Sequence, residues 1–222
     1  MKNTYIGQAW LVLVLSLSFG AALAGVETWL RPTIEANKLA ETIRRIPEIV
    51  PGSDAARSAE VEPLVVITGT GRAASRHDVF RALDATGRQV GWVIQAGGKG
   101  FADRIELLIG LDAPAETITG LSILDQKETP GLGNRIEEIG DDDNKGFLWQ
   151  FAHHYPQADR PLIVTTASPD MSRSDAANRI LALSGATISS RSVCTIINEA
   201  LSGELISALR SSVSTAESRH GE

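Results

Sequence analysis

The amino-terminal stretch of this chain carries no charge from Asn3 to Val26, and most of it is apolar or small. About twenty helical residues, each rising about 1.5 Å, cross a hydrocarbon core of about 30 Å. Trp10 and Trp29 stand near the two ends of the stretch, where indole rings favour the membrane interface. The pattern predicts a transmembrane helix, with residues 1–30 as a membrane anchor in the lipid bilayer.

A cleaved secretory signal is the alternative for this segment. Ala22-Leu23-Ala24 forms an A-x-A cleavage pattern after the apolar stretch. Lys2 and the amino terminus supply the only positive charge ahead of that stretch, which is also long for a signal sequence. A retained anchor is therefore favoured, and either interpretation places the rest of the chain on the same outer side.

Charge around the segment favours the opposite orientation. Basic residues after the span outnumber Lys2; they are Arg31, Lys38, Arg44 and Arg45. A positive-inside count would keep the bulk of the chain in the cytoplasm. The charge count and the two interpretations of the segment therefore disagree.

The 222 residues, 43 % hydrophobic and 22 % charged, suffice for one anchor, one linker and one domain. Residues 34–49 predict a helix that continues from the membrane and ends near Pro47 and Pro51-Gly52. With the polar residues that follow, 31–62 form a helical stalk and linker. We expect the domain over 63–210 and a frayed tail over 211–222.

Short apolar runs alternate with turn residues in the expected domain. Candidate strands cover residues 64–68, 79–83, 90–94, 105–111, 118–124, 162–165 and 179–183. Several of these runs are paired through short turns, which is typical of antiparallel hairpins. With helices at both ends, the pattern predicts an α+β fold, in which a transmembrane helix precedes an antiparallel-sheet domain with flanking helices.

Composition excludes several classes of function. The net charge of −6, without any basic patch, argues against nucleic acid as a partner. Cys194 is the only cysteine, so no internal disulfide forms, and its place in a helical pattern predicts a small buried residue. The sequence alone justifies no arrangement of nucleophile, base and acid, so it predicts no catalytic site.

Three motif-like signals fail on inspection. Gly69 to Ala74 fits a dinucleotide fingerprint, but the next predicted strand lacks the acidic residue that binds ribose. Asp141 to Gly146 imitates a calcium loop, but Lys145 stands where a ligand is needed. His153-His154 would diverge in either a helix or a strand. The sequence therefore predicts neither a nucleotide site at 69–74 nor a metal site.

Small residues and hydroxyls precede a predicted helix near the carboxyl end. The turn Ser184-Gly185-Ala186-Thr187 is followed by apolar residues at helical spacing from Val193 onward. Ser189 or Ser190 can cap that helix, whose free N–H groups and dipole favour an anion. An ordinary glycine turn with a serine cap is the alternative, and the residues alone leave it open.

Two motif blocks in this order resemble the FMN-binding domains of the G subunit of the Rnf electron-transport complex and the C subunit of the sodium-translocating NADH:quinone oxidoreductase. The run Leu183 to Val193 resembles their S/T-G-A-T flavinylation motif. The order Lys99-Gly100-Phe101, Ile118-Thr119-Gly120 and Glu128 to Gly133 resembles the Rnf G subunit. Residues 31–37 after the membrane segment do so too, and the resemblance covers nearly the whole chain.

The resemblance implies an FMN covalently attached through a phosphoester to Thr187, made by a separate flavin transferase. Ser184, Ser189 and Ser190 are then secondary donors to the phosphate, and Gly185 and Ala186 leave room for it. The segment Glu128 to Leu132 is the candidate wall of the isoalloxazine pocket, in which Thr129 would contact the ring edge and Leu132 would cover a face. A mere turn between elements is the alternative for this segment.

The implied function is a redox subunit of an ion-translocating complex. Electrons would pass to and from other membrane subunits, so no independent turnover of a small substrate is expected. The implied location is the bacterial inner membrane, with one span and the domain on the periplasmic side, and we follow this against the charge count.

One position departs from the family motif. The family has an acidic residue three positions before the S/T of the motif, where this chain has Leu181. Loss of that carboxylate would weaken attachment if the transferase recognises it. Two alternatives stay open: an anchored binding or scaffold protein without flavin, and a stand-alone extracytoplasmic flavin carrier.

Overall fold

The computed structural model describes residues 2–68, 75–140, 146–154, 156–168 and 176–217. The chain divides into two compact units, Met1–Glu41 and Thr42–Glu222. Helix α1 (Lys2–Ile49) makes up the described part of the first unit and enters the second. The second unit thus starts at Thr42. The sequence instead predicted that the domain begins at residue 63.

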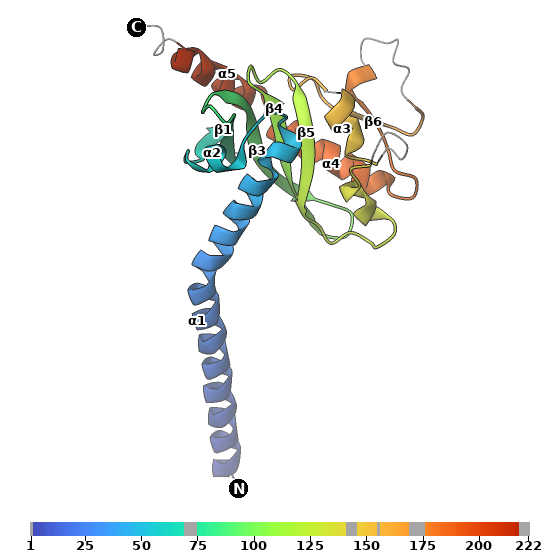
Figure 1. The fold of residues 1–222 in the computed structure, drawn as a ribbon. Helices are drawn as coiled ribbons and strands as arrows, with labels where there is room; N and C mark the ends of the chain where they lie inside the picture. The colour runs from blue at the N-terminus through green and yellow to red at the C-terminus, as the bar shows by residue number, and fades with distance from the viewer. Residues whose placement is uncertain (1, 69–74, 141–145, 155, 169–175, 218–222) are drawn as a thin grey trace. The chain divides into compact units, whose positions relative to one another are not determined.

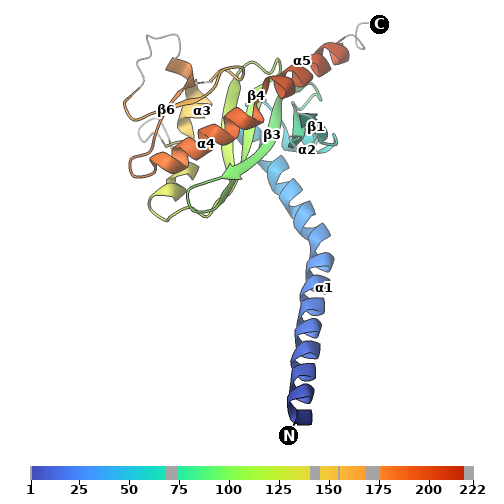
Figure 2. The same ribbon diagram turned by 180° about the vertical axis from the view of Figure 1, so that it is seen from behind.

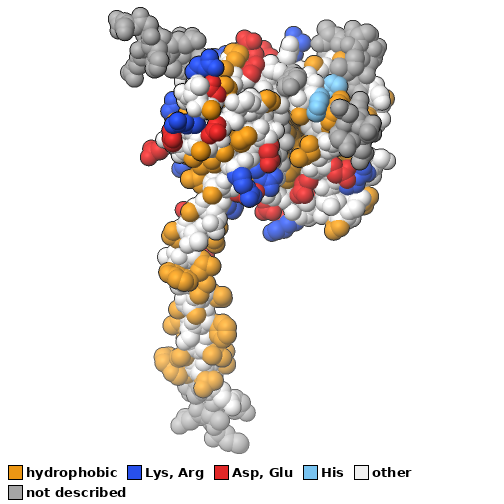
Figure 3. Space-filling model, in the orientation of Figure 1, with side chains coloured by type: hydrophobic (Ala, Val, Ile, Leu, Met, Phe, Trp, Pro, Cys, Tyr) orange, Lys and Arg blue, Asp and Glu red, His pale blue; other side chains and the backbone are white. Residues whose placement is uncertain are grey.

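Helix α1 exposes large apolar side chains along its amino-terminal part, as Figure 3 shows. By length and composition it is the one helix among the described residues that could cross a membrane. Trp10 and Trp29 are both exposed, and an i,i+4 ion pair joins Arg31 to Glu27 beyond the apolar stretch. The helix fits a single-pass anchor, and a signal sequence would pass the same test.

A five-stranded sheet forms the centre of the second unit (Figure 1). All its neighbouring strands are antiparallel and follow chain order: β1 (Leu64–Thr68), β2 (Ser75–Leu83), β3 (Gln89–Lys99), β4 (Arg104–Asp112) and β5 (Ile118–Asp125). Alternating apolar residues and short turns produce this order, because each hairpin buries its own side chains against the next. The predicted α+β fold with an antiparallel sheet is confirmed.

Both faces of the sheet are buried, each in a hydrophobic core of its own. Successive residues of a strand point to opposite faces and therefore enter different cores. Ile94 and Leu107 belong to one core, which also contains residues of α4 (Thr187–Ala200) and α5 (Gly203–Glu217). Val93 and Leu108, their strand neighbours, belong to a second core with the end of α1. Helix α4 lies across the first of these faces in Figure 2.

The end of α1 approaches the second face closely. Thr119 donates its hydroxyl to the Ile49 carbonyl at 2.7 Å. Gly110 and Gly120 pair across β4 and β5, and an added Cβ at either would lie 2.6 or 2.8 Å from that carbonyl oxygen. The Thr-Gly of the I-T-G motif therefore accommodates the end of α1, in agreement with a second unit that begins at Thr42.

The remaining elements are short, apart from α5. They are α2 (Ala55–Ala59), η2 (Gly133–Glu137), α3 (Trp149–His154), η3 (Ala176–Asn178), and the strands β6 (Ile163–Thr165) and β7 (Arg179–Leu181), which pair in parallel. Helix α2 lies in the segment predicted as a linker, capped by Asp54, whose side chain accepts from Arg57 N at 2.9 Å. Helix α5 continues to Glu217, through part of the tail predicted to fray.

Candidate functional site

Helix α4 begins at Thr187, directly after the turn that the sequence singled out. Gly185 has φ +80°, a left-handed conformation that suits glycine, and Ala186 stands at the N-cap without a side-chain capping bond. The prediction that Ser189 or Ser190 caps the helix is therefore wrong. The helix begins before both serines. The Ser190 hydroxyl instead stabilises the preceding turn, since it accepts from Leu183 N at 3.1 Å and donates to the Ala186 carbonyl at 3.0 Å.

Thr187 is half-buried at this helix start, and its hydroxyl has no hydrogen bond to any described residue. The first helical bond of α4 comes from Ser190 N to the Ala186 carbonyl, at 2.9 Å. No described side chain accepts from the amides of residues 187–189. Unpaired amides at a helix start, with the positive end of the dipole, favour an anion such as phosphate.

The three predicted serine donors lie in different environments. Ser189, 3 % exposed, donates its hydroxyl to Glu128 Oε2 at 2.7 Å. The Ser190 hydroxyl is buried and bonded to the turn between Leu183 and Ala186. Ser184 is exposed at the surface of the turn. Of these serines only Ser189 lines the cavity beside Thr187, and its hydroxyl hydrogen is already used.

A second loop, residues 128–133, faces the helix start. The Thr129 carbonyl accepts from the amides of Leu132 and Asn134 at 3.2 and 3.3 Å, and Gly131 has φ +76°. The turn brings Leu132 within 3.1 Å of a Cβ built on Gly185. The two sequence blocks, far apart along the chain, therefore meet in space.

The two loops and the β3–β4 turn enclose a cavity of about 290 Å³. Its lining consists of Phe101, Glu128, Thr129, Leu132, Gly133, Gly185, Ala186, Thr187, Ile188 and Ser189. Phe101, Leu132 and Ile188 are 59 %, 47 % and 54 % exposed, so the rim is apolar. A polar end at Thr187 and an apolar rim suit a ligand that joins an anion to a flat aromatic ring. Sequence reasoning assigned no role to Phe101, Gly133 or Ile188, because only tertiary contact brings them here.

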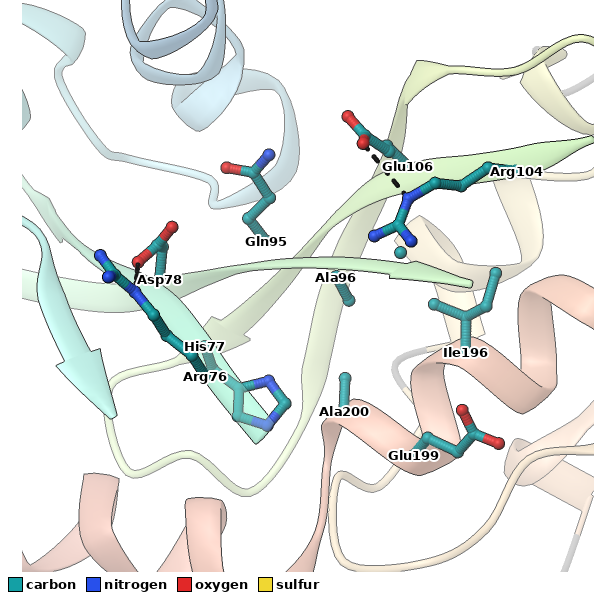
Figure 4. A pocket seen from close by; sticks show the side chains of 11 residues that line it. Arg76, His77, Asp78, Gln95, Ala96, Arg104, Glu106, Ile196, Glu199 and Ala200 are labelled. Atoms are coloured by element: carbon teal, nitrogen blue, oxygen red, sulfur yellow. Dashed lines mark hydrogen bonds and ion pairs between the residues drawn. The ribbon is translucent and has the colours of Figure 1, made fainter. Parts of the chain in front are cut away.

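A larger cavity, of about 370 Å³, lies further along α4 (Figure 4). It is lined by strand residues Arg76, His77, Asp78, Gln95, Ala96, Gly97, Arg104 and Glu106 and by Ile196, Glu199 and Ala200 of α4. None of the residues that the sequence singled out as cofactor-binding lines it. Both arginines in its wall are bonded to carboxylates there: Arg76 to Asp78 and Arg104 to Glu106, each at 3.3 Å.

Cys194 is buried, as predicted, and the two histidines of α3 both contact the Trp149 ring. Cys194 is buried in α4, and burial raises the pKa of its thiol to about 12, which makes it an unreactive core residue. His153 is exposed and stacks on Trp149 with ring centroids 4.4 Å apart. Among the described residues no group of acidic, histidine and cysteine side chains could hold a metal ion. Residues 69–74 and 141–145 of the other rejected motifs lie outside the described residues.

Comparison with known proteins agrees with the motifs. The FMN-binding domain family matches residues 100–202, which include both loops of the cavity and all of α4. Over these residues the chain is similar to the FMN-binding domain family. The resemblance inferred from the sequence is confirmed.

Two relatives of the chain are subunits of oxidoreductase complexes. The G subunit of the ion-translocating oxidoreductase complex of Methanosarcina acetivorans is 31 % identical over 122 residues, 55 % of each chain. The chain thus spans about half the length of that relative. The G subunit of the Na(+)-translocating ferredoxin:NAD(+) oxidoreductase complex of Acetobacterium woodii is 26 % identical over 193 residues, 85 % of this chain and 86 % of the relative.

A solved structure has the same fold. The crystal structure of NqrC from Shewanella oneidensis covers 68 % of this chain and 69 % of its own, with a TM-score of 0.51 and 18 % identity. At that identity the likeness establishes the fold of the FMN-binding domain and nothing finer.

Proposed function

We propose that this chain is a membrane-anchored flavoprotein subunit of an ion-translocating electron-transport complex, carrying FMN as a phosphoester of Thr187. The observation that carries the proposal is the Thr187 hydroxyl. It has no partner among the described residues and lies beside unpaired amides in a cavity that the family's two motif blocks build together. The family match and the two relatives, both G subunits of such complexes, support the same conclusion.

The residues present fit FMN. The amides of residues 187–189 would hold the phosphate, and Gly185 and Ala186 would leave space beside it. Ser184, on the surface of the turn, is a donor that could reach the phosphate from outside, whereas Ser189 would act mainly through Glu128. Thr129, Leu132 and the exposed Phe101 would surround the ring, to which the bound FMN brings its redox chemistry.

Attachment transfers the phosphate of a flavin nucleotide to the threonine hydroxyl. The bond from Thr187 Oγ1 to phosphorus forms, and the bond from that phosphorus to the leaving group of an activated flavin nucleotide breaks. The hydroxyl proton leaves with the transferase or the leaving group. Thr187 is half-buried next to exposed Ser184, Gly185 and Ile188, so the folded turn offers this hydroxyl to a separate flavin transferase.

The cavity is small for a whole cofactor, since pockets that enclose a ligand span about 300 to 1,000 Å³. An edge of the ring would therefore stay exposed at the apolar rim, where another membrane subunit could exchange electrons with it. The anchor would cross the bacterial inner membrane once, with the domain on the periplasmic side. A covalent cofactor suits that side, because a lost FMN would not be replaced there.

Residue 181 bears on how well the transferase works on this chain. Gln150 holds the backbone of Leu181 on both sides: its Oε1 accepts from Leu181 N at 2.6 Å and its Nε2 donates to the Leu181 carbonyl at 3.1 Å. These bonds do not depend on the side chain at 181. We therefore propose that the turn keeps its shape with leucine in place of the family's acidic residue.

The test is covalent flavin on the chain co-expressed with a flavin transferase. Denaturing electrophoresis under ultraviolet light should give a fluorescent band for the wild type. The intact mass of the chain should increase by that of one attached FMN. Thr187→Ala should lose both signals and Thr187→Ser should keep them, since serine retains the hydroxyl. Thr195→Ala is the matched control, since it removes an exposed threonine hydroxyl of the same helix outside the cavity, and it should stay fluorescent. A dark wild-type band, with the transferase active on a known substrate, would favour a binding or scaffold protein.

A further inference from the structure

Glu128 is a carboxylate buried at the bottom of the cofactor cavity, with 5 % of its surface exposed. Its Oε1 accepts from Ala102 N at 3.0 Å, and its Oε2 accepts from the Ser189 hydroxyl at 2.7 Å. Both carboxylate oxygens therefore act as acceptors of hydrogen bonds from the protein. Glu128 thus joins the β3–β4 turn to the first turn of α4.

Two glycines leave the room that this carboxylate occupies. A Cβ built on Gly133 would lie 2.7 Å from Glu128 Oε2 and 2.8 Å from Ser189 Oγ. A Cβ built on Gly100 would meet Glu128 Oε1. The chain therefore approaches the carboxylate from two sides with its smallest residue, and the buried charge is a built feature of the cavity.

No basic side chain neutralises this charge within the described part of the chain, where none of the ion pairs includes Glu128. The neighbouring Lys127 instead reaches Asp103, at 3.8 Å. The two hydrogen-bond donors are dipoles that stabilise the carboxylate without cancelling its charge. The field of Glu128 consequently extends into the cavity, and water screens it little at its source because the residue is only 5 % exposed.

We propose that Glu128 sets the redox poise of the site: its charge lowers the reduction potential of a flavin held in the cavity, and the Ser189 hydroxyl moderates that effect. The inference rests on the proposed function. Electron uptake adds negative charge to the ring, and a nearby fixed negative charge opposes it. Charges beside the ring are among the means by which proteins tune a flavin.

The experiment compares midpoint potentials of the full chain, purified with its flavin attached and titrated while flavin absorbance is followed. Glu128→Gln keeps the shape, accepts from Ala102 N and can donate to Ser189, so it removes the charge alone. We expect its potential to rise by about 30 mV, a tenfold change in the equilibrium constant of a two-electron couple. Glu199→Gln is the matched control. It removes an exposed carboxylate from the larger cavity on the same helix and should leave the potential unchanged.

Ser189→Ala gives a test of opposite sign. It keeps the carboxylate but removes the hydroxyl that moderates it, so the potential should fall, and alanine is well tolerated within a helix. An unchanged or lower potential in flavin-loaded Glu128→Gln would overturn the inference. If Glu128→Gln does not load, an unchanged or higher potential in Ser189→Ala overturns it. A wild type without flavin would instead contradict the proposed function.

Discussion

Two cavities share helix α4, and the larger of them is the less suited to a ligand. In the cavity of about 370 Å³, both arginines of the wall are paired with a carboxylate two residues away on the same strand. In the cavity of about 290 Å³, a buried carboxylate lies near a threonine hydroxyl and helix amides that have no partner in the described structure. Polar groups left without partners are costly unless something binds them, so they mark a site better than volume does.

The first way to break this comparison is a methyl group placed in each cavity. Gly133→Ala would drive a Cβ between Glu128 and Ser189, both firmly packed, at 2.7 and 2.8 Å. We expect a loss of about 1 to 3 kcal/mol in the free energy of unfolding, as for other overpacked sites. Flavin attachment should fall as well. Urea unfolding and band fluorescence of the full chain measure the two effects.

Gly97→Ala is the counterpart in the larger cavity. Its Cβ would lie 2.8 Å from Arg104 Nη2, the end of a flexible side chain that can move aside, and 3.2 Å from the Ile105 carbonyl. The free energy of unfolding should change by less than the Gly133→Ala value, and flavin content should not change. Flavin loss in Gly97→Ala, with normal loading of Gly133→Ala, would reverse the assignment of the two cavities.

The sequence predicted the sheet and the loops of the smaller cavity better than the contacts of individual side chains. Alternating apolar runs and turn residues identified the sheet strands, because each hairpin is encoded locally; Asp84, for example, accepts from the amides of Thr86 and Arg88 in the β2–β3 turn. The motif blocks at 128–133 and 184–187 identified the loops of the smaller cavity. Their spatial neighbour Phe101 belonged to a quoted block, yet no local pattern indicated that its ring would be exposed at the rim.

The errors came from residues whose environment is set by distant parts of the chain. By sequence alone, hydroxyls at several positions around the start of α4 are equally suited to capping. Contacts with Glu128 and Leu183 determine what Ser189 and Ser190 do. Gly120 of β5 is needed because the Ile49 carbonyl, at the end of α1, lies close to it. The second compact unit begins at Thr42 for the same reason, since the glycine pair that Ile49 approaches lies on β4 and β5, far along the chain.

Removing an arginine from the larger cavity should have a smaller effect. The Arg104 side chain is 64 % exposed and its Nε lies 3.3 Å from Glu106 Oε1. Exposed pairs of this kind contribute about 0.2 to 1 kcal/mol. Arg104→Ala should therefore change the free energy of unfolding by no more than about 1 kcal/mol, with full flavin loading. A large loss of flavin would show that the larger cavity takes part in binding.

The smallest expected effect is a pH dependence that belongs to the larger cavity alone. Burial lowers the pKa of His77 below 6.5, although the charge of Asp78 opposes this, and His77 Nε2 shares a hydrogen bond of 3.1 Å with Thr68 Oγ1. As pH falls below about 6.5 the unfolded chain takes up the proton more readily than the folded one, so stability decreases. His77→Gln removes the titrating group, and its melting temperature should fall less than that of the wild type between pH 7.5 and 5.5. Equal slopes would mean that His77 is as solvated in the folded chain as in the unfolded one. A matching pH dependence of flavin loading, absent in His77→Gln, would show that the two cavities are coupled through α4.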